Sequence, residues 1–103
     1  MKVVWMPQAK MQLRQTASYI RNEFGKKARE DFMYEVQQAN HLLSLNPNMG
    51  KREPFLEGRS VMYRSLLVNR LNKMIYSIVD DHIEVAAFWD VRREPESLAN
   101  QVK

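Results

Sequence analysis

Residues 63–96 read "YRSLLVNRLNKMIYSIVDDHIEVAAFWDVRREPE", and this stretch decides the fold. It is rich in β-branched and aromatic residues, and short polar segments at 69–72 and 80–82 interrupt it. Together with the residues just before it, the pattern predicts three strands, over about 60–68, 73–80 and 83–89. Because such short connections join antiparallel neighbours, we expect a three-stranded β-meander.

The predicted strands are apolar on both faces, whereas a sheet with one face in water alternates apolar and polar residues. In the first strand, Leu66 and Leu67 point to opposite sides. Strict alternation in the third strand places Val85, Ala87 and Trp89 together on one side. We therefore expect helices to cover one face and something else to cover part of the second.

The segment before the meander predicts a strand over 2–6 and then two helices. Pro7 suits the first turn of a helix, and Gly25 suits the position just past its end. Apolar residues recur at spacings of three and four in both helices: Ala9, Leu13, Ala17, Ile20 and Phe24, then Ala28, Phe32, Val36, Ala39 and Leu43. Residues 46–60 indicate a loop, and 95–102 a short helix or a loose end.

These elements predict one α+β domain over residues 1–103. An N-terminal strand precedes an antiparallel helical hairpin, which packs on a mostly antiparallel sheet that includes the meander. Hydrophobic residues at 45% and charged residues at 27% are ordinary for a globular chain and argue against disorder.

Charge and cysteine content narrow the classes of function. The chain has 16 basic and 12 acidic residues, and the excess of four positive charges lies within 51–73. Such a segment either attracts an anionic partner or is simply a solvated basic loop and hairpin. The absence of cysteine excludes disulfides and thiol chemistry. With no apparent signal peptide or membrane-spanning run, we expect a cytoplasmic protein without a membrane partner.

The sequence contains no pattern for a metal or cofactor. His41 and His82 are the only histidines, and neither has a second ligand at a suitable spacing. Glycine-rich phosphate loops and serine-hydrolase motifs are also missing, so we expect no cofactor and no metal. Arg64, in mid-strand, is expected either to pair with a carboxylate such as Glu84 or Asp90, or to face a groove that receives an anion.

Six short motifs follow one another in an informative order: "ASYI" at 17–20, "GKKA" at 25–28, "NPNMG" at 46–50, "YRSLL" at 63–67, "MIYSI" at 74–78 and "DVRREPESL" at 90–98. In this order and spacing the chain, from residue 3 to about 98, resembles the RelE/ParE superfamily of toxins from bacterial type II toxin–antitoxin pairs. The resemblance implies a growth-arresting toxin, often linked to plasmid stabilisation. It also implies an antitoxin that wraps over the toxin and forms a hetero-oligomer with it.

The superfamily has an mRNA-cleaving branch and a ParE-like branch that inhibits DNA gyrase by binding. Arg64, Lys73 and Arg93 match basic positions of the nuclease branch. However, Leu66 stands where that branch has a second basic residue, and Asp90 stands where it often has histidine. Residues 94–103 also contain no tyrosine or histidine. The resemblance therefore favours a gyrase inhibitor, with a ribosome-dependent mRNA endoribonuclease as the alternative.

We predict that the antitoxin or the target contacts six residues: Arg64, Lys73, Trp89, Asp90, Arg92 and Arg93. If the chain is a nuclease, Arg64, Lys73 and Arg93 are the expected catalytic residues. Trp89 with the two neighbouring arginines suits binding of a phosphate or a peptide carboxylate. The stretch from Asp90 onward is the expected target contact, because it is the least needed for the core.

Overall fold

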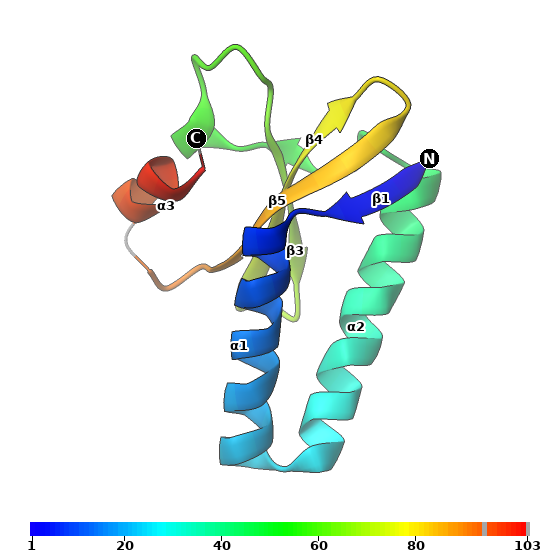
Figure 1. The fold of residues 1–103 in the computed structure, drawn as a ribbon, viewed down its shortest axis with the longest axis vertical. Helices are drawn as coiled ribbons and strands as arrows, with labels where there is room; N and C mark the ends of the chain where they lie inside the picture. Colours follow the sequence, from blue (N-terminus) through cyan, green and yellow to red (C-terminus); the bar gives the residue numbers. More distant parts are fainter. Residues whose placement is uncertain (94, 103) are drawn as a thin grey trace.

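The structure is a computed structural model that describes residues 1–93 and 95–102. Its elements are β1 (Lys2–Trp5), α1 (Pro7–Phe24), α2 (Lys26–Leu45), β2 (Lys51–Arg52), the 3₁₀ helix η1 (Pro54–Leu56), β3 (Arg64–Val68), β4 (Asn72–Val79), β5 (His82–Asp90) and α3 (Pro95–Gln101). The strands form one sheet in the order β1-β5-β4-β3-β2 (Figure 1). β1 runs parallel to β5, and every other neighbouring pair is antiparallel.

The helical hairpin forms as the sequence predicts. Pro7 occupies the first turn of α1, and Gly25 joins the helices at a φ of 96°, which glycine adopts without a steric penalty. The closed end of the hairpin projects away from the sheet (Figure 1). The hairpin's apolar stripes cover one face of the sheet, except at Phe24, which was expected on the stripe of α1 but is exposed. The buried core there consists of Ala9, Ala17, Phe32, Val36, Ala39, Leu43, Val68, Met74, Tyr76, Ile83, Val85 and Phe88.

The second face of the sheet is covered in part by the chain itself. A second core joins this face to η1 and α3, and its members are Leu56, Ile75, Ala87, Trp89, Leu98 and Val102. The Arg59 guanidinium donates hydrogen bonds to the carbonyls of Ala99 and Val102, which ties α3 to the loop before β3. The expectation that the stretch beyond Asp90 is least needed for the core is therefore wrong.

A β-bulge changes the side-chain pattern of β5. Ile75 pairs with Ala87 and Tyr76 pairs with Val85, so Ala86 is the extra residue on β5. As a result Val85 packs under the helices, while Ala87 and Trp89 lie in the second core. The expectation that these three residues share one face was wrong, because strict alternation ignores a bulge.

Two smaller differences concern strand limits and the predicted loop. The first meander strand begins at Arg64 rather than near residue 60, and the segment 46–60 contains β2 and η1.

Among the described helices, none combines the length and the apolar character that crossing a bilayer requires.

Candidate functional site

Arg64 lies on the side of the sheet that faces the helices. It pairs in register with Tyr76, a member of the core beneath the hairpin. Its Nη1 donates a 2.7 Å hydrogen bond to the carbonyl of Gly50. The Tyr76 hydroxyl donates to the carbonyl of Pro47 at 2.8 Å and accepts from the Gly50 N–H at 2.9 Å. Arg64 and Tyr76 together hold the loop that follows α2.

The two carboxylates considered as partners of Arg64 are used elsewhere. Glu84 contacts the His82 ring nitrogen Nε2 at 2.9 Å, and Asp90 binds Arg92. Burial raises the pKa of the Tyr76 hydroxyl, while the Gly50 hydrogen bond and the Arg64 charge act in the opposite direction. The Arg64 guanidinium therefore donates its hydrogen bonds to backbone carbonyls and not to either of these carboxylates.

Lys73 lies on the opposite face and forms an ion pair with Glu53. Glu53 is 1% exposed, and its carboxylate also accepts a 3.2 Å hydrogen bond from the N–H of Phe55 at the start of η1. The Lys73 ammonium lies 5.8 Å from the centre of the Phe55 ring. Because a buried carboxylate needs a counter-ion, Lys73 has a structural partner that the sequence analysis did not foresee.

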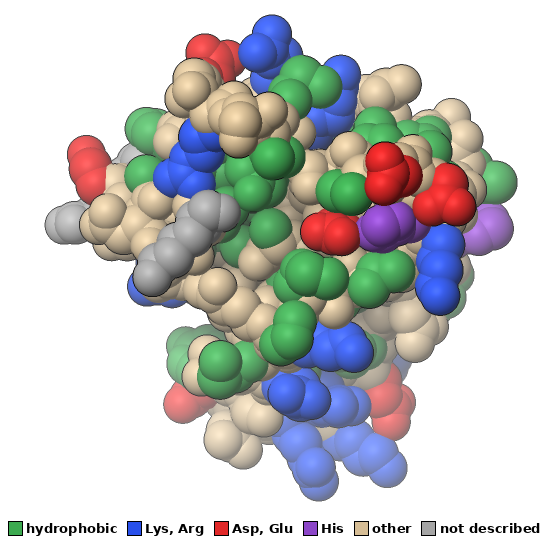
Figure 2. Space-filling model, turned by 45° about the horizontal axis from the view of Figure 1, so that its top comes forward, with side chains coloured by type: hydrophobic (Ala, Val, Ile, Leu, Met, Phe, Trp, Pro, Cys, Tyr) green, Lys and Arg blue, Asp and Glu red, His purple; other side chains and the backbone are tan. Residues whose placement is uncertain are grey.

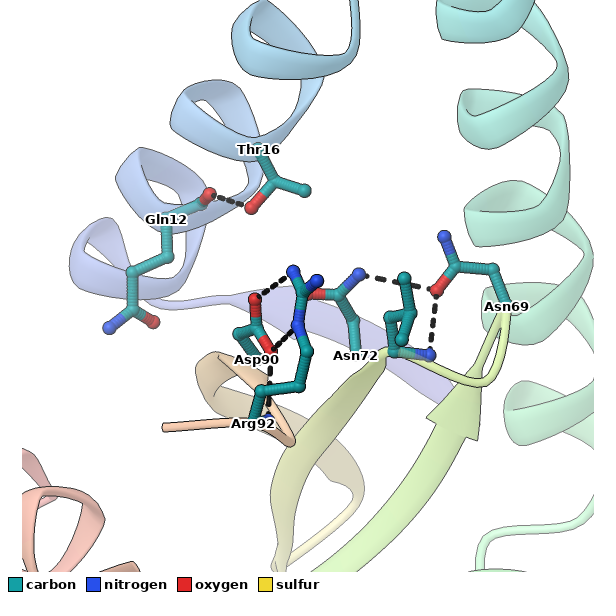
Figure 3. Close-up of polar contacts among 7 residues, drawn as sticks. Gln12, Thr16, Asn69, Asn72, Asp90 and Arg92 are labelled. Carbon is teal, nitrogen blue, oxygen red and sulfur yellow. Dashed lines mark hydrogen bonds and ion pairs between the residues drawn. The ribbon is translucent and has the colours of Figure 1, made fainter. Parts of the chain in front are cut away.

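The remaining predicted site residues lie near the end of β5. Trp89 is only 1% exposed, and the Arg93 guanidinium stacks over its ring at 4.2 Å from the ring centre. Asp90 accepts hydrogen bonds from Nε and Nη2 of Arg92, at 3.0 and 2.7 Å (Figure 3). The hydrogen bond with Arg92 is the main reason that the pKa of Asp90 lies below its ordinary value.

The three cations that match the nuclease branch do not converge on one point. Lys73 pairs in register with Trp89, so it shares the second face with Trp89 and the stacked Arg93. Arg64 faces the helices across the sheet. Within the described residues, no group of three histidine, aspartate or glutamate side chains is arranged to hold a metal ion.

A cleft that we call the hairpin cleft lies between α1 and the β3–β4 turn. It has a volume of about 430 Å³ and is lined by Gln15, Thr16, Tyr19, Ile20, Phe24, Asn69, Leu71, Asn72, Asp90 and Arg92. Asn72 donates a 3.2 Å hydrogen bond to the side chain of Asn69, which fixes the turn on one side of the cleft (Figure 3). Tyr19 and Phe24 meet edge to face at 6.4 Å, yet they are 57% and 69% exposed.

A second cleft, the β1 groove, lies between β1, α1 and α2 and has a volume of about 480 Å³. Its lining combines apolar side chains such as Trp5 and Leu13 with the cations Lys2, Lys10 and Arg14. None of the described lining residues is acidic. Figure 2 shows one group of Lys and Arg side chains at the lower end of the view, with others at its upper edge, and a group of acidic side chains beside histidine on the right.

Sequence reasoning missed both clefts, because each brings together segments that are distant in the chain. Lys10 and Arg14 are four positions apart, so they lie on the same side of a helix, next to the stripe residue Leu13. This spacing was the available signal for a basic edge along α1. Tyr19 precedes the stripe residue Ile20 and therefore lies off the predicted buried stripe. Neither signal indicates by itself which strand or turn lies beside the helix.

This arrangement, a helical hairpin and a small C-terminal helix on a mixed five-stranded sheet, defines an α+β fold of the RelE/ParE type. A solved structure titled "Chromosomal ParDE TA system from P. aeruginosa" matches with a TM-score of 0.72 and 15% identity, over 88% of this chain and 96% of that chain. The YoeB dimer from Staphylococcus aureus matches with a TM-score of 0.54 and 18% identity, over 84% and 92%. At these identities the similarity concerns the fold.

A family model described as the ParE toxin of the type II toxin–antitoxin system, parDE, matches residues 3–95. The chain belongs to this family. This confirms the resemblance to the RelE/ParE superfamily and the fold class that the sequence predicted. No curated protein sequence matches the chain.

Proposed function

We propose that this toxin inhibits DNA gyrase by binding and that a cognate antitoxin neutralises it. The observation that carries the proposal is the separation of Arg64 from Lys73 and Arg93 on opposite faces of the sheet. Cleavage of RNA needs a base and a cluster of cations aimed at one phosphate. An inhibitor that acts by binding needs only an exposed set of anchors, so the separation favours inhibition over mRNA cleavage.

The hairpin cleft supplies the anchors for the target. Interfaces draw most of their binding energy from a few aromatic and arginine residues. Tyr19 and Phe24 are exposed here beside Arg92, and the Asp90 carboxylate holds the Arg92 side chain in one orientation. In this proposal Asp90 and Arg92 remain contacts of the target, and Tyr19 and Phe24 on α1 are added as aromatic anchors. Because gyrase acts on the chromosome, a toxin that binds gyrase would act in the cytoplasm. Inhibition of gyrase would arrest growth of the cell.

The β1 groove suits the antitoxin. β1 is an edge strand, and no described strand pairs with its outer side, so an extended segment can add to the sheet there. The groove offers apolar surface together with three cations that form no ion pair with any described residue. An acidic, amphipathic antitoxin segment would bury this surface and neutralise these charges.

A supercoiling assay with purified toxin tests the proposal. We expect wild-type toxin to inhibit gyrase, and Tyr19→Ala with Phe24→Ala to weaken inhibition by about tenfold or more. Tyr34→Ala is the matched control, because Tyr34 is an equally exposed tyrosine on α2 that lines neither cleft. Full supercoiling in a large excess of folded wild-type toxin would contradict the proposal. So would new transcript ends within translated codons after induction, since these would indicate mRNA cleavage.

A further inference from the structure

Arg70 in the β3–β4 turn has a backbone conformation that arginine rarely adopts. Its φ is 70° and follows a φ of 49° at Asn69, so two successive residues lie in the left-handed region. Hairpin turns with this conformation favour asparagine followed by glycine, because a side chain at the second position strains the backbone. Glycine or asparagine in place of Arg70 would relieve the strain, so the arginine needs an explanation other than folding.

The charge of Arg70 takes part in no ion pair within the described part of the chain. Its side chain is exposed. Other cations of the basic segment at 51–73 have a structural role, since Lys73 pairs with Glu53 and Arg59 binds the end of α3. Arg70 thus combines a strained backbone with a charge that stabilises no described contact of this kind.

The turn places Arg70 at the edge of the hairpin cleft. Asn69 and Leu71, its two neighbours in the chain, both line this cleft. The Asn69 side chain accepts a 3.4 Å hydrogen bond from the Leu71 N–H (Figure 3). The Leu71 carbonyl accepts a 2.9 Å hydrogen bond from the N–H of Val91, which ties the turn to the segment that carries Arg92. The backbone of the turn is therefore fixed relative to the cleft before any partner binds.

Exposed apolar side chains surround this edge of the cleft. Leu71 and Val91 are 42% and 41% exposed. Tyr19 and Phe24 line the cleft from α1 and are more exposed still. Clustered apolar and aromatic side chains of this kind mark protein interfaces, in which arginine is also enriched.

The charges at the cleft indicate the kind of partner surface. The Asp90 carboxylate already binds Arg92, whereas Arg70 adds a further positive charge beside them. A nucleic-acid backbone is less suitable, because it requires several cations and is repelled by the Asp90 carboxylate. An acidic side chain of a protein is the better match, since its carboxylate accepts charge-assisted hydrogen bonds from arginine.

We propose that Arg70 contacts an acidic side chain on the surface of the toxin's target, beside the apolar contacts that the hairpin cleft makes. This assignment rests on the proposed function, in which the cleft binds gyrase. The strained turn persists because arginine here contributes to target binding what glycine or asparagine would contribute to folding. Loss of Arg70 should therefore improve stability and reduce inhibition at the same time.

Three variants of the full-length toxin separate these two effects. Arg70→Asn relieves the strain and removes the charge, and Arg70→Lys keeps both. Asp80→Asn is the matched control, because Asp80 has a φ of 52° in the turn at the opposite end of β4 and does not line the cleft. Thermal denaturation measures stability, and the half-inhibitory concentration in the supercoiling assay measures potency. Growth arrest after induction reports action on the target, whichever molecule the target is.

We expect Arg70→Asn to raise the melting temperature by about 2 °C or more. The same variant should raise the half-inhibitory concentration about fivefold or more, and this effect should shrink at high salt. Arg70→Lys should melt as the wild type does and raise that concentration less than about threefold, because it keeps the charge. Asp80→Asn should match the wild type in potency and be at least as stable.

Equal potency of Arg70→Asn and wild type, or no gain in its stability, would overturn the proposal. So would an equal loss of potency in Asp80→Asn, or binding of a short DNA or RNA that Arg70→Asn abolishes. Wild-type toxin that arrests growth without inhibiting gyrase would contradict the proposed function alone. Weaker arrest by Arg70→Asn would then still support Arg70 as a target contact. Wild-type toxin that does neither would overturn both.

Discussion

Lys73 shows how a single residue type is compatible with two different roles. A lysine on a basic sheet matches the nuclease branch, yet here its ammonium is the counter-ion of the buried Glu53 carboxylate. The sequence could not distinguish these roles, because the partner lies twenty positions away in a loop with no periodic pattern. Arg64 presented a similar difficulty, since its main acceptor is a backbone carbonyl, which leaves no trace in the sequence.

The pairing leads to a prediction about stability. Lys73→Met should leave the Glu53 carboxylate buried without a counter-ion and lower the free energy of unfolding by about 3 kcal/mol. Lys51→Met, a change at an exposed lysine of β2, should alter it by less than about 0.5 kcal/mol. Combining Lys73→Met with Glu53→Gln should recover part of the loss. Urea denaturation measures all three. Unchanged stability together with lost toxicity would instead show that Lys73 acts in function.

At the scale of elements, local signals predicted the hairpin and the meander. Pro7, Gly25 and the short polar turns mark the ends of elements, and the spacing of apolar residues identifies their type. The bulge at Ala86 and the position of α3 were not predictable in this way. A bulge depends on the register with a neighbouring strand, and a seven-residue helix is too short to show a reliable period.

The docking of α3 can be tested at one buried side chain. Leu98 is fully buried against the second core, so Leu98→Ala should leave a cavity beside Trp89 and reduce the free energy of unfolding by about 2–4 kcal/mol. Asn100→Ala changes an exposed position of the same helix and should have little effect. Denaturation followed by tryptophan fluorescence measures both variants. Equal stability of the two would mean that α3 does not contribute to the core.

At the scale of the whole molecule, the fold determines which charged side chains pair with each other and which lie together on the surface. Three of the cations at 51–73 have partners within the chain: Lys73 pairs with Glu53, Arg64 binds a loop carbonyl and Arg59 binds the end of α3. The β1 groove takes its cations from β1 and α1, within residues 2–22, which contain no acidic residue. The sequence therefore held this charge signal, but not the packing of β1 beside α1 and α2 that forms the groove.

The cations of the β1 groove lead to a prediction about the rate at which the antitoxin binds. Lys10→Glu with Arg14→Glu reverses the charge of the β1 groove, and should slow association with an acidic antitoxin by about tenfold or more at low salt. Lys26→Glu with Lys27→Glu changes the net charge equally but alters exposed pairs in the first turn of α2, which contribute little to stability. Stopped-flow association at low and high salt compares the two double variants. Since screening removes steering between exposed charges, the difference between them should shrink at high salt. Equal slowing by both pairs would show that only net charge matters and would remove the groove as the docking site.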